Sequence, residues 1–150
     1  MHGFILRRVE PADIEAIHRI EEECQFRPWP TAGFEFHLAQ ERSTRFWCLC
    51  PKDNRERIVG YICFRILFEE CYLLNIAVDK DYWGRGLGSF MLKCLLTYAR
   101  RRGAKKVVLD VYKDNFLAIS FYQSHGFSFV CNPRRVKGEF CVMEMKSLSQ

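Results

Sequence analysis

The sequence lacks the signals of a membrane-spanning, secreted or multidomain protein. No window reaches the roughly eighteen apolar residues of a transmembrane span, so we expect no membrane partner. The first residues, MHGFILRRVEPAD, contain neither the apolar core nor the cleavage site of a signal peptide, which favours a cytoplasmic protein. No linker, low-complexity tract or internal repeat divides the 150 residues, a length typical of one domain. We therefore expect residues 1–150 to form a single domain.

The chain also lacks the paired cysteine spacing of a zinc site. None of its eight cysteines belongs to a C-x-x-C pair, and most lie in apolar runs such as YICF and MLKCLL. The spacing of Cys48 and Cys50 points both thiols to one face of a strand. Because no secretory signal is present, we interpret the cysteines as reduced thiols in the core, with metal or disulfide roles less favoured. We expect no metal site.

Charge of one sign is not in large excess. The 23 basic and 18 acidic residues give a formal charge of +5. This mild excess favours an anionic ligand, but it is well below that of a nucleic-acid-binding tail. We therefore expect no direct nucleic-acid partner.

Hydrophobic periodicity and turn residues predict the order β-α-α-β-β-β-α-β-α-β-β. The short connection EE favours an antiparallel hairpin at its centre, and the strand–helix–strand unit from 71 to 112 predicts a crossover between parallel strands. Thr31 is expected to cap the second helix. The result is an α/β fold, a mixed sheet of about seven strands with four helices on its faces. The expected strands are 4–10, 45–50, 58–69, 71–78, 106–112, 127–131 and 139–145, and the expected helices are 11–24, 31–40, 86–102 and 115–126.

Three glycines, Gly84, Gly86 and Gly88, lie between an apolar strand and the longest predicted helix. Unpaired amides and the positive end of the helix dipole make such a turn a cradle for anions, and missing Cβ atoms let a diphosphate reach the backbone. A tight turn before a helix is the alternative. Two familiar cradles do not fit, because Ser89 stands where a dinucleotide fingerprint has glycine and no Lys-Ser/Thr follows Gly88 as in a P-loop.

Two motifs resemble those of the GNAT acetyltransferase superfamily. In the motif Q/R-x-x-G-x-G/A, Gly86, Leu87 and Gly88 match the last three positions, while Trp83 stands where glutamine or arginine is usual. Arg85 could supply the positive charge instead. The second signature, N-x-x-A-x-x-x-Y-x-x-x-G-F, is matched in full, at Asn115, Ala118, Tyr122, Gly126 and Phe127.

Within the superfamily, the chain most resembles the ribosomal-protein-alanine N-acetyltransferases. PWPTAGFEFHL is similar to their P-W-x-x-x-x-F segment, and LLNIAVDKDYWGRGLGSFML to their N-I-A-V-x-P-x-Y-Q-x-x-G-x-G block. Two departures concern the chemistry and the acceptor. Asp110 replaces the glutamate of their L-E-V strand, and NPRRVKGEF lacks the Tyr-Tyr pair of their closing hairpin.

The resemblance implies acetyl-coenzyme A as co-substrate and assigns residues to it. Backbone groups of Ile76, Ala77 and Val78 would pair with the pantetheine arm, beside a bulge that opens the sheet. Amides in the cradle would hold the diphosphate, and Asn115 the far side of the arm. The cradle residues are Gly84, Arg85, Gly86, Leu87, Gly88 and Ser89.

The resemblance also assigns the acid–base chemistry. Asp110 takes the position of the general base, although a strand-end aspartate that caps the next turn is the alternative. Glu69 and Glu70, in the predicted hairpin turn, are other candidate bases. Tyr122 takes the position of the acid that returns a proton to the sulfur, with a core tyrosine as the alternative.

We therefore expect an N-acetyltransferase that moves acetyl to the α-amine of a protein N-terminus by direct attack in a ternary complex. A ribosomal protein is one candidate acceptor. The shorter closing hairpin keeps a lysine or small-amine acetyltransferase open as an alternative. A non-catalytic module that binds coenzyme A is the alternative of another class.

Overall fold

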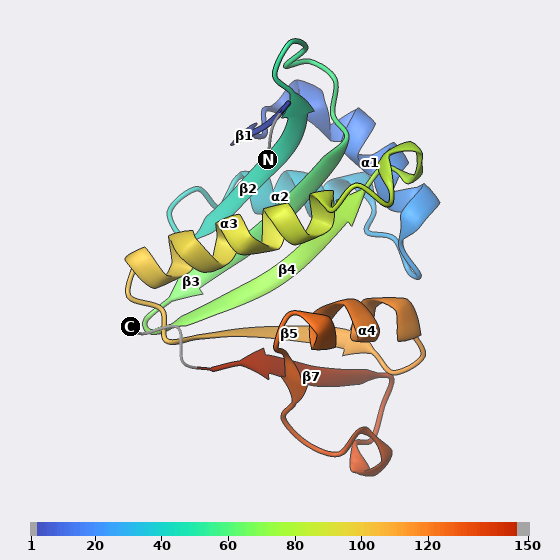
Figure 1. The fold of residues 1–150 in the computed structure, drawn as a ribbon, viewed down its shortest axis with the longest axis vertical. Helices are drawn as coiled ribbons and strands as arrows, with labels where there is room; N and C mark the ends of the chain where they lie inside the picture. The colour runs from blue at the N-terminus through green and yellow to red at the C-terminus, as the bar shows by residue number, and fades with distance from the viewer. Residues whose placement is uncertain (1–2, 147–150) are drawn as a thin grey trace.

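A seven-stranded mixed sheet organises the chain in the computed structural model, which describes residues 3–146 (Figure 1). The strand order is β1-β2-β3-β4-β5-β7-β6, and every neighbouring pair is antiparallel except β4 and β5. Figure 1 shows β4 and β5 diverging toward one end of the sheet. The strands are β1 (Phe4–Arg8), β2 (Thr44–Pro51), β3 (Gly60–Leu67), β4 (Glu70–Val78), β5 (Lys106–Tyr112), β6 (Ser128–Phe129) and β7 (Phe140–Met145).

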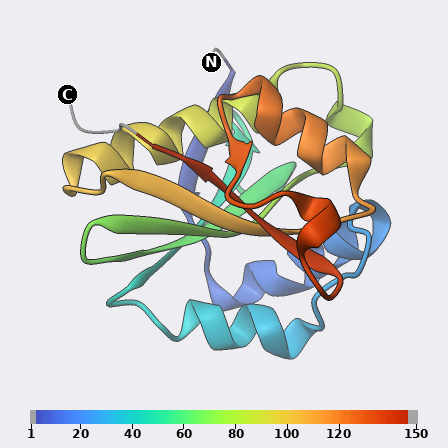
Figure 2. The ribbon, with the colours of Figure 1, turned by 90° about the horizontal axis from the view of Figure 1, so that it is seen from below.

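Helices cover both faces of the sheet. Figure 2 shows α3 and α4 on one face and α1 and α2 on the other. Within residues 3–146, no helix is long and apolar enough to cross a membrane. The α-helices are α1 (Ile14–Cys24), α2 (Thr31–Leu38), α3 (Leu87–Arg101) and α4 (Phe116–Ser124), and three short 3-10 turns are Pro11–Asp13, Lys80–Tyr82 and Pro133–Arg135.

The predicted element order is confirmed, as are the central antiparallel hairpin and the parallel crossover. Most element bounds differ from the expected ones by one or two residues at an end, and two details are wrong. Thr31 is the first residue of α2 rather than its cap, because Pro30 takes the extended conformation of the N-cap position. The strand expected at 127–131 is reduced to Ser128–Phe129, since only these two residues pair with β7.

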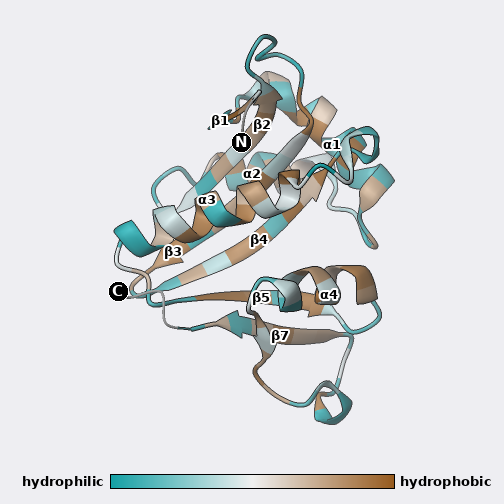
Figure 3. Ribbon diagram, viewed as in Figure 1, coloured by the Kyte–Doolittle hydropathy of each residue, from teal (hydrophilic) through white to brown (hydrophobic). Residues whose placement is uncertain are grey.

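The sheet separates two hydrophobic cores. One core, around Ile62 and Leu73, packs under α3, where Met91, Leu92 and Leu95 are fully buried. The other lies under α1 and α2 and contains the buried ring of Phe34. Figure 3 shows the matching pattern, with hydrophobic bands along the strands and hydrophilic patches on the outer surface of α3. The buried cysteines Cys48 and Cys50 belong to the second core, and their sulfurs lie 4.0 Å apart.

A bulge in β4 prepares the opening between β4 and β5. Along the β3–β4 pair, Cys63 pairs with Asn75 but Phe64 pairs with Leu73, which leaves Leu74 as the extra residue. The parallel pairing with β5 ends at the same point, with Leu73 opposite Leu109. The bulge thus lies just before the strand segment at which the resemblance placed it. Beyond Leu73, no strand within residues 3–146 pairs with this edge of β4.

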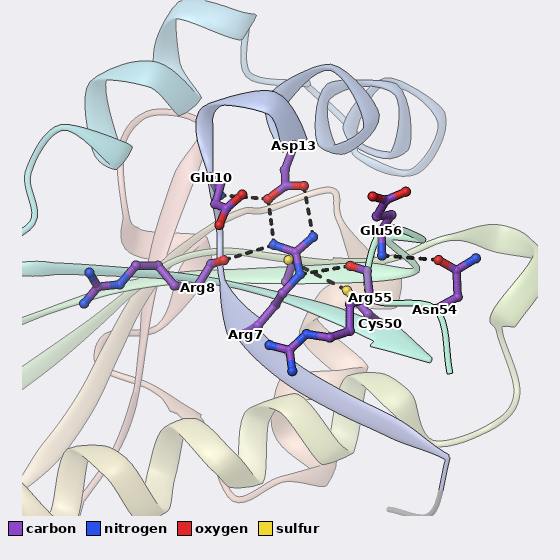
Figure 4. A network of polar contacts seen from close by, with 9 residues as sticks. Arg7, Arg8, Glu10, Asp13, Cys50, Asn54, Arg55 and Glu56 are labelled. Atoms are coloured by element: carbon purple, nitrogen blue, oxygen red, sulfur yellow. Dashed lines mark hydrogen bonds and ion pairs between the residues drawn. The ribbon is translucent and has the colours of Figure 1, made fainter. Parts of the chain in front are cut away.

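A partly buried ion pair holds the start of α1 against β1. The Arg7 guanidinium donates two hydrogen bonds to the Asp13 carboxylate, at 2.8 and 3.0 Å, and the Glu10 amide donates a third at 2.7 Å (Figure 4). Partial burial alone would raise the pKa of Asp13, but the bonds from Arg7 and Glu10 outweigh it and hold this pKa below its ordinary value.

Replacing Asp13 with asparagine is expected to lower the free energy of unfolding by about 1–3 kcal/mol at pH 7, since a charge-assisted pair is lost. A carboxyl with a lowered folded-state pKa stabilises the protein above its unfolded pKa of about 4, and this contribution disappears as pH falls through the folded value. The difference in free energy of unfolding between wild type and Asp13→Asn should therefore shrink below about pH 4. Urea unfolding at pH 7 and pH 3 measures it, with Asp53→Asn in the exposed turn as control. An equal loss at both pH values would contradict the assignment.

Candidate functional site

A cavity of about 760 Å³ lies where β4 and β5 part. Its walls come from α1, the loop between α1 and α2, the free edge of β4, the glycine turn, the end of β5 and α4. The volume lies within the range of small-molecule and cofactor sites. The predicted site residues that line it are Ile76, Ala77, Val78, Gly84, Gly86, Leu87, Gly88, Ser89, Asp110, Asn115 and Tyr122.

The glycine turn forms one end of the cavity and presents unpaired amides. Gly84 and Gly86 have φ of 80° and 76°, a left-handed conformation that glycine adopts without strain. Helix α3 begins directly afterwards, at Leu87. Within the described part of the chain, no amide of residues 84–89 donates a hydrogen bond to a carbonyl or side chain. Such amides at a helix N-terminus make an anion site.

Gly88 brings the turn close to α4. A Cβ atom on Gly88 would lie 3.5 Å from the ring of Phe121 and 3.9 Å from Val78. A larger side chain would therefore have to enter either this contact or the cavity. The approach explains why a third glycine follows the two with positive φ.

His125 fastens the turn to α4 from the other side. Its Nε2 lies 2.9 Å from the Ser89 hydroxyl, and its Nδ1 lies 2.8 Å from the Phe121 carbonyl oxygen. The sequence motifs gave no role to this histidine. Its contacts hold the first turn of α3 in place beside α4.

The free edge of β4 offers backbone groups to a ligand. The Asp79 amide donates to the Val59 carbonyl, and along an antiparallel pair the backbone groups of successive residues point alternately toward and away from the partner strand. The residues of β4 opposite Ile62 and Gly60 therefore point their backbone groups away from β3. These residues are Ile76 and Val78, whose backbone groups consequently face the opening.

Both carbonyls on this edge already have side-chain partners. The Ile76 carbonyl accepts a hydrogen bond from Gln25 Nε2 at 2.9 Å. The Val78 carbonyl accepts one from Trp83 Nε1 at 2.7 Å and contacts the Cys24 thiol at 3.3 Å. The indole of Trp83, half exposed, therefore covers the edge at the position where the family motif usually has glutamine or arginine.

Arg85 lies differently from the other predicted cradle residues. Its guanidinium stacks over the ring of Tyr82, 4.8 Å from the ring centre, and the residue does not line the cavity. Asn115 lines the cavity but also caps α4, because its side-chain oxygen accepts a hydrogen bond from the Ala118 amide at 3.3 Å. The amide cradle therefore consists of backbone rather than cationic side chains.

Asp110 and Tyr122 line the same cavity from β5 and α4. Asp110 is exposed, and it makes no ion pair with another residue of 3–146. The ring of Tyr122 packs against Phe121 and Phe127, with ring centres 5.5 and 5.6 Å apart. Burial raises the pKa of Tyr122, so its hydroxyl stays protonated at neutral pH.

Other charged candidates lie outside the cavity. Glu69 and Glu70, at the β3–β4 turn, pair with Lys105 and Lys106 at 3.3 and 3.2 Å. The arginines at the end of α3 stand a helix length from the glycine turn, roughly 20 Å for 15 residues at 1.5 Å each. Among the residues described, no group of three His, Cys, Asp or Glu side chains could hold a metal ion.

The sequence motifs missed the part of the cavity's aromatic wall that Tyr112 and Phe140 form at its other end. Arg27, in the α1–α2 loop, makes two hydrogen bonds to Glu139 before β7, at 2.7 and 3.0 Å. Its guanidinium also lies 4.8 Å from the ring centre of Tyr112, which packs against Phe140 at 4.1 Å. Three distant segments therefore meet over the opening, and only the spacing of aromatics near the strand ends could have indicated it.

A buried carboxylate was also missed. Glu21 on α1 is 1% exposed, lines the cavity and accepts hydrogen bonds from three other elements. In the sequence it is one of three consecutive glutamates on an amphipathic helix, and only its place on the apolar face with Ile17 and Ile20 distinguishes it.

Comparisons with known proteins agree with this geometry. The profile of the acetyltransferase (GNAT) family matches residues 14–127. The ribosomal protein bS18-alanine N-acetyltransferase of Escherichia coli (strain K12) is 30% identical over 120 residues, which cover 80% of this chain and 78% of the relative. An uncharacterised N-acetyltransferase of Methanocaldococcus jannaschii is 29% identical over 129 residues, covering 82% of this chain and 77% of the relative.

Solved structures show the same architecture. The ribosomal-protein-S18-alanine N-acetyltransferase from Escherichia coli superposes with a TM-score of 0.80 at 25% identity, covering 98% of this chain and 95% of that one. Ard1 from Thermoplasma volcanium superposes with a TM-score of 0.80 at 25% identity, covering 97% of this chain and 98% of that one. A Thermoplasma acidophilum N-acetyltransferase in complex with coenzyme A shares the fold, with a TM-score of 0.79 at 16% identity over 96% and 99% of the two chains. The chain belongs to the acetyltransferase (GNAT) family and is an acetyl-CoA-dependent N-acetyltransferase.

Proposed function

We propose that this enzyme acetylates the α-amine of a protein N-terminus. The observation that carries the proposal is the cavity itself, which joins a cradle of unpaired amides to an aromatic opening through the gap between β4 and β5. The relatives support the choice of acceptor, since the Escherichia coli relative is named for acetylating the alanine of a ribosomal protein. A ribosomal protein is accordingly the first candidate partner.

The residues of the cavity fit coenzyme A. The amides of residues 84–89 suit a diphosphate, because they have no partner among the described residues and stand at a helix N-terminus. The backbone of Ile76 and Val78 suits an extended amide-containing arm, which would bind as an added strand. For that arm to reach the Val78 carbonyl, the Trp83 indole must share or leave its bond there. When bound, acetyl-coenzyme A supplies the acetyl group as a thioester.

Two side chains of the cavity are proposed to transfer the protons of the reaction. Asp110 is the proposed base, which accepts a proton from the acceptor amine directly or through water; a free α-amine has a pKa near 8. Tyr122 is the proposed acid, because burial raises its pKa and keeps its proton available for a thiolate leaving group. Both reach the cavity from elements that flank the gap.

The opposite end of the cavity suits a peptide. Its wall is aromatic, from Phe26, Trp29, Tyr112 and Phe140, and the Arg27–Glu139 pair bridges it. Phe140 ends the segment NPRRVKGEF, which lacks the Tyr-Tyr pair that the resemblance implies there. An apolar first side chain on the acceptor fits such a wall better than a charged one.

A peptide panel tests the acceptor. The enzyme would be incubated with acetyl-coenzyme A and peptides with free N-termini, with and without internal lysine, and with the same peptides N-terminally blocked. Mass spectrometry with fragmentation locates the acetyl group. We expect acetylation at the α-amine and none on blocked peptides. Acetyl on the lysines of blocked peptides at a comparable rate would replace the proposal with side-chain acetylation, and no transfer to any peptide would reject a peptide acceptor.

Replacing Asp110 with asparagine is expected to lower kcat by roughly 10²-fold or more, within the range for a general base, with acetyl-coenzyme A affinity nearly unchanged. The exposed position of Asp110 makes an effect on folding small. Steady-state kinetics and calorimetry measure the two quantities, with Asp114→Asn in the following turn as the matched control. Unchanged turnover in Asp110→Asn would assign the proton to water alone.

A further inference from the structure

Glu21 connects the acceptor side of the cavity to the strand that carries the cofactor edge. Its carboxylate accepts hydrogen bonds from the Trp29 amide and from Asn75 Nδ2, both at 2.9 Å, and from the Tyr61 hydroxyl. These donors belong to the α1–α2 loop, to β4 and to β3. One side chain therefore holds two walls of the cavity, the α1–α2 loop and β4, together with the neighbouring strand β3, at fixed distances from α1.

The connection continues into the free edge of β4. Asn75, 9% exposed, follows the bulge residue Leu74 directly. Gln25 donates through its Nε2 to the Asn75 side-chain oxygen at 2.8 Å and to the Ile76 carbonyl at 2.9 Å. The orientation of the bulged strand and that of the α1–α2 loop thus depend on the same buried network.

The charge on Glu21 is not needed for packing. All three of its partners are neutral donors, and no Lys, Arg or His nitrogen within residues 3–146 lies within ion-pair distance of it. A buried carboxylate without a cation is costly, and an apolar side chain of similar size is often neutral or stabilising at such a place. What an apolar side chain could not do is orient three donors around one point. The network therefore indicates that Glu21 serves to hold these three donors in fixed positions.

The loop that Glu21 holds in position lies on the acceptor side of the cavity. Trp29, whose amide is held by Glu21, packs against His37 and Phe34, with ring centres 4.9 and 5.2 Å apart, and lines the cavity. Arg27, two residues earlier in the same loop, makes the bridge to Glu139. A loop released from Glu21 would shift both the aromatic wall and the bridge.

We propose that Glu21 is a positioning residue for the acceptor: it fixes the α1–α2 loop against the bulged β4 and so sets the width of the opening through which the amine reaches the gap. The inference rests on the proposed function, because it concerns the peptide end of that site. Glu21 touches no reacting atom in this account. Its removal should consequently weaken the use of the acceptor far more than the binding of the cofactor.

Glu21→Gln is the first test. The substitution keeps the size but turns one acceptor oxygen into an amide that faces donors, so one contact must break. We expect the acceptor KM to rise about 10- to 100-fold, since small misplacements of binding groups have effects of this size, while acetyl-coenzyme A affinity stays within about 2-fold. Glu22→Gln, the same change at the neighbouring exposed position, should leave both values unchanged.

Two further variants separate positioning from general destabilisation. The double variant Glu21→Gln/Asn75→Asp exchanges the two groups and restores a carboxylate–amide pair at the same place. We expect its acceptor KM to be at least about 5-fold lower than that of Glu21→Gln. Tyr61→Phe removes a single donor and should raise the acceptor KM by about 2- to 10-fold. If Glu21→Gln does not fold, the acceptor KM of Tyr61→Phe still tests the inference.

Hydrogen exchange gives a readout that does not depend on the acceptor. The Trp29 amide donates to Glu21, so its exchange should be at least about 10-fold faster in Glu21→Gln, with helix α3 amides unchanged; Tyr61→Phe leaves this bond in place and should show a smaller local increase. Unchanged acceptor KM together with unchanged Trp29 exchange would overturn the inference, as would a uniform increase in exchange across the protein. If the wild type transfers acetyl to no N-terminal peptide, the proposed function fails, and the local change in Trp29 exchange still decides the inference about the loop.

Discussion

Replacing Tyr122 with phenylalanine is expected to lower kcat by roughly ten- to a thousand-fold while acetyl-coenzyme A still binds. The change removes only the hydroxyl, and the ring contacts with Phe121 and Phe127 remain. No other described residue hydrogen-bonds to this hydroxyl, so its loss leaves no protein group unpaired. Because burial raises the pKa of Tyr122, wild-type activity should show no loss from its ionisation below about pH 10, the ordinary tyrosine value.

The effect should be confined to this tyrosine. Tyr98→Phe on α3 removes a hydroxyl that accepts a hydrogen bond from Arg45 at 2.9 Å, outside the cavity, and should leave kcat unchanged. Steady-state kinetics together with calorimetric titration of acetyl-coenzyme A measure both variants. Full activity in Tyr122→Phe would remove this residue from the mechanism and assign the proton to solvent.

Replacing Gly86 with alanine is expected to weaken acetyl-coenzyme A binding by about 10- to 100-fold. Gly86 has a φ of 76°, and a residue with a Cβ atom in the left-handed conformation costs about 1–2 kcal/mol. The backbone can relieve this strain by turning the peptide groups before α3, which rotates the amides of residues 84–89 away from a common point. Since these amides are the proposed diphosphate site, binding should fall more than stability does.

Gly103 provides the matched control for strain. It has a φ of 89° beyond the other end of α3, and a Cβ atom there would meet nothing within 4 Å. Gly103→Ala should therefore lose a similar amount of stability and bind acetyl-coenzyme A as the wild type does. Thermal unfolding and calorimetry of the two variants make the comparison. Equal affinities in Gly86→Ala, Gly103→Ala and wild type would show that the turn does not hold the cofactor.

Local sequence signals were sufficient for the architecture and for one end of the site. Alternation predicted the strands, and the glycines before an apolar helical pattern predicted the turn where Gly84 and Gly86 adopt positive φ. The signature containing Asn115 and Tyr122 placed two residues that the fold does bring to the cavity. These features depend on neighbours a few positions apart, which is why a single sequence contains them.

The other end of the site depends on contacts that sequence spacing does not record. Arg27 and Glu139 are 112 positions apart, and Glu21 meets Asn75 across 54. Which of the three glutamates at 21–23 is buried depends on how α1 is rotated against the sheet, a tertiary property. The hydrogen bond from Trp83 to the Val78 carbonyl likewise follows from the path of the chain between β4 and α3.

A proton–nitrogen NMR titration with coenzyme A would show whether the glycine turn holds the diphosphate. We expect the backbone amides of residues 84–89, which have no partner within the described chain, to acquire one and to show the largest downfield shifts, with slower exchange. Amides near Arg101, at the other end of α3, should hardly move. Binding of coenzyme A that leaves the amides of 84–89 unshifted, with the largest changes elsewhere, would contradict the account.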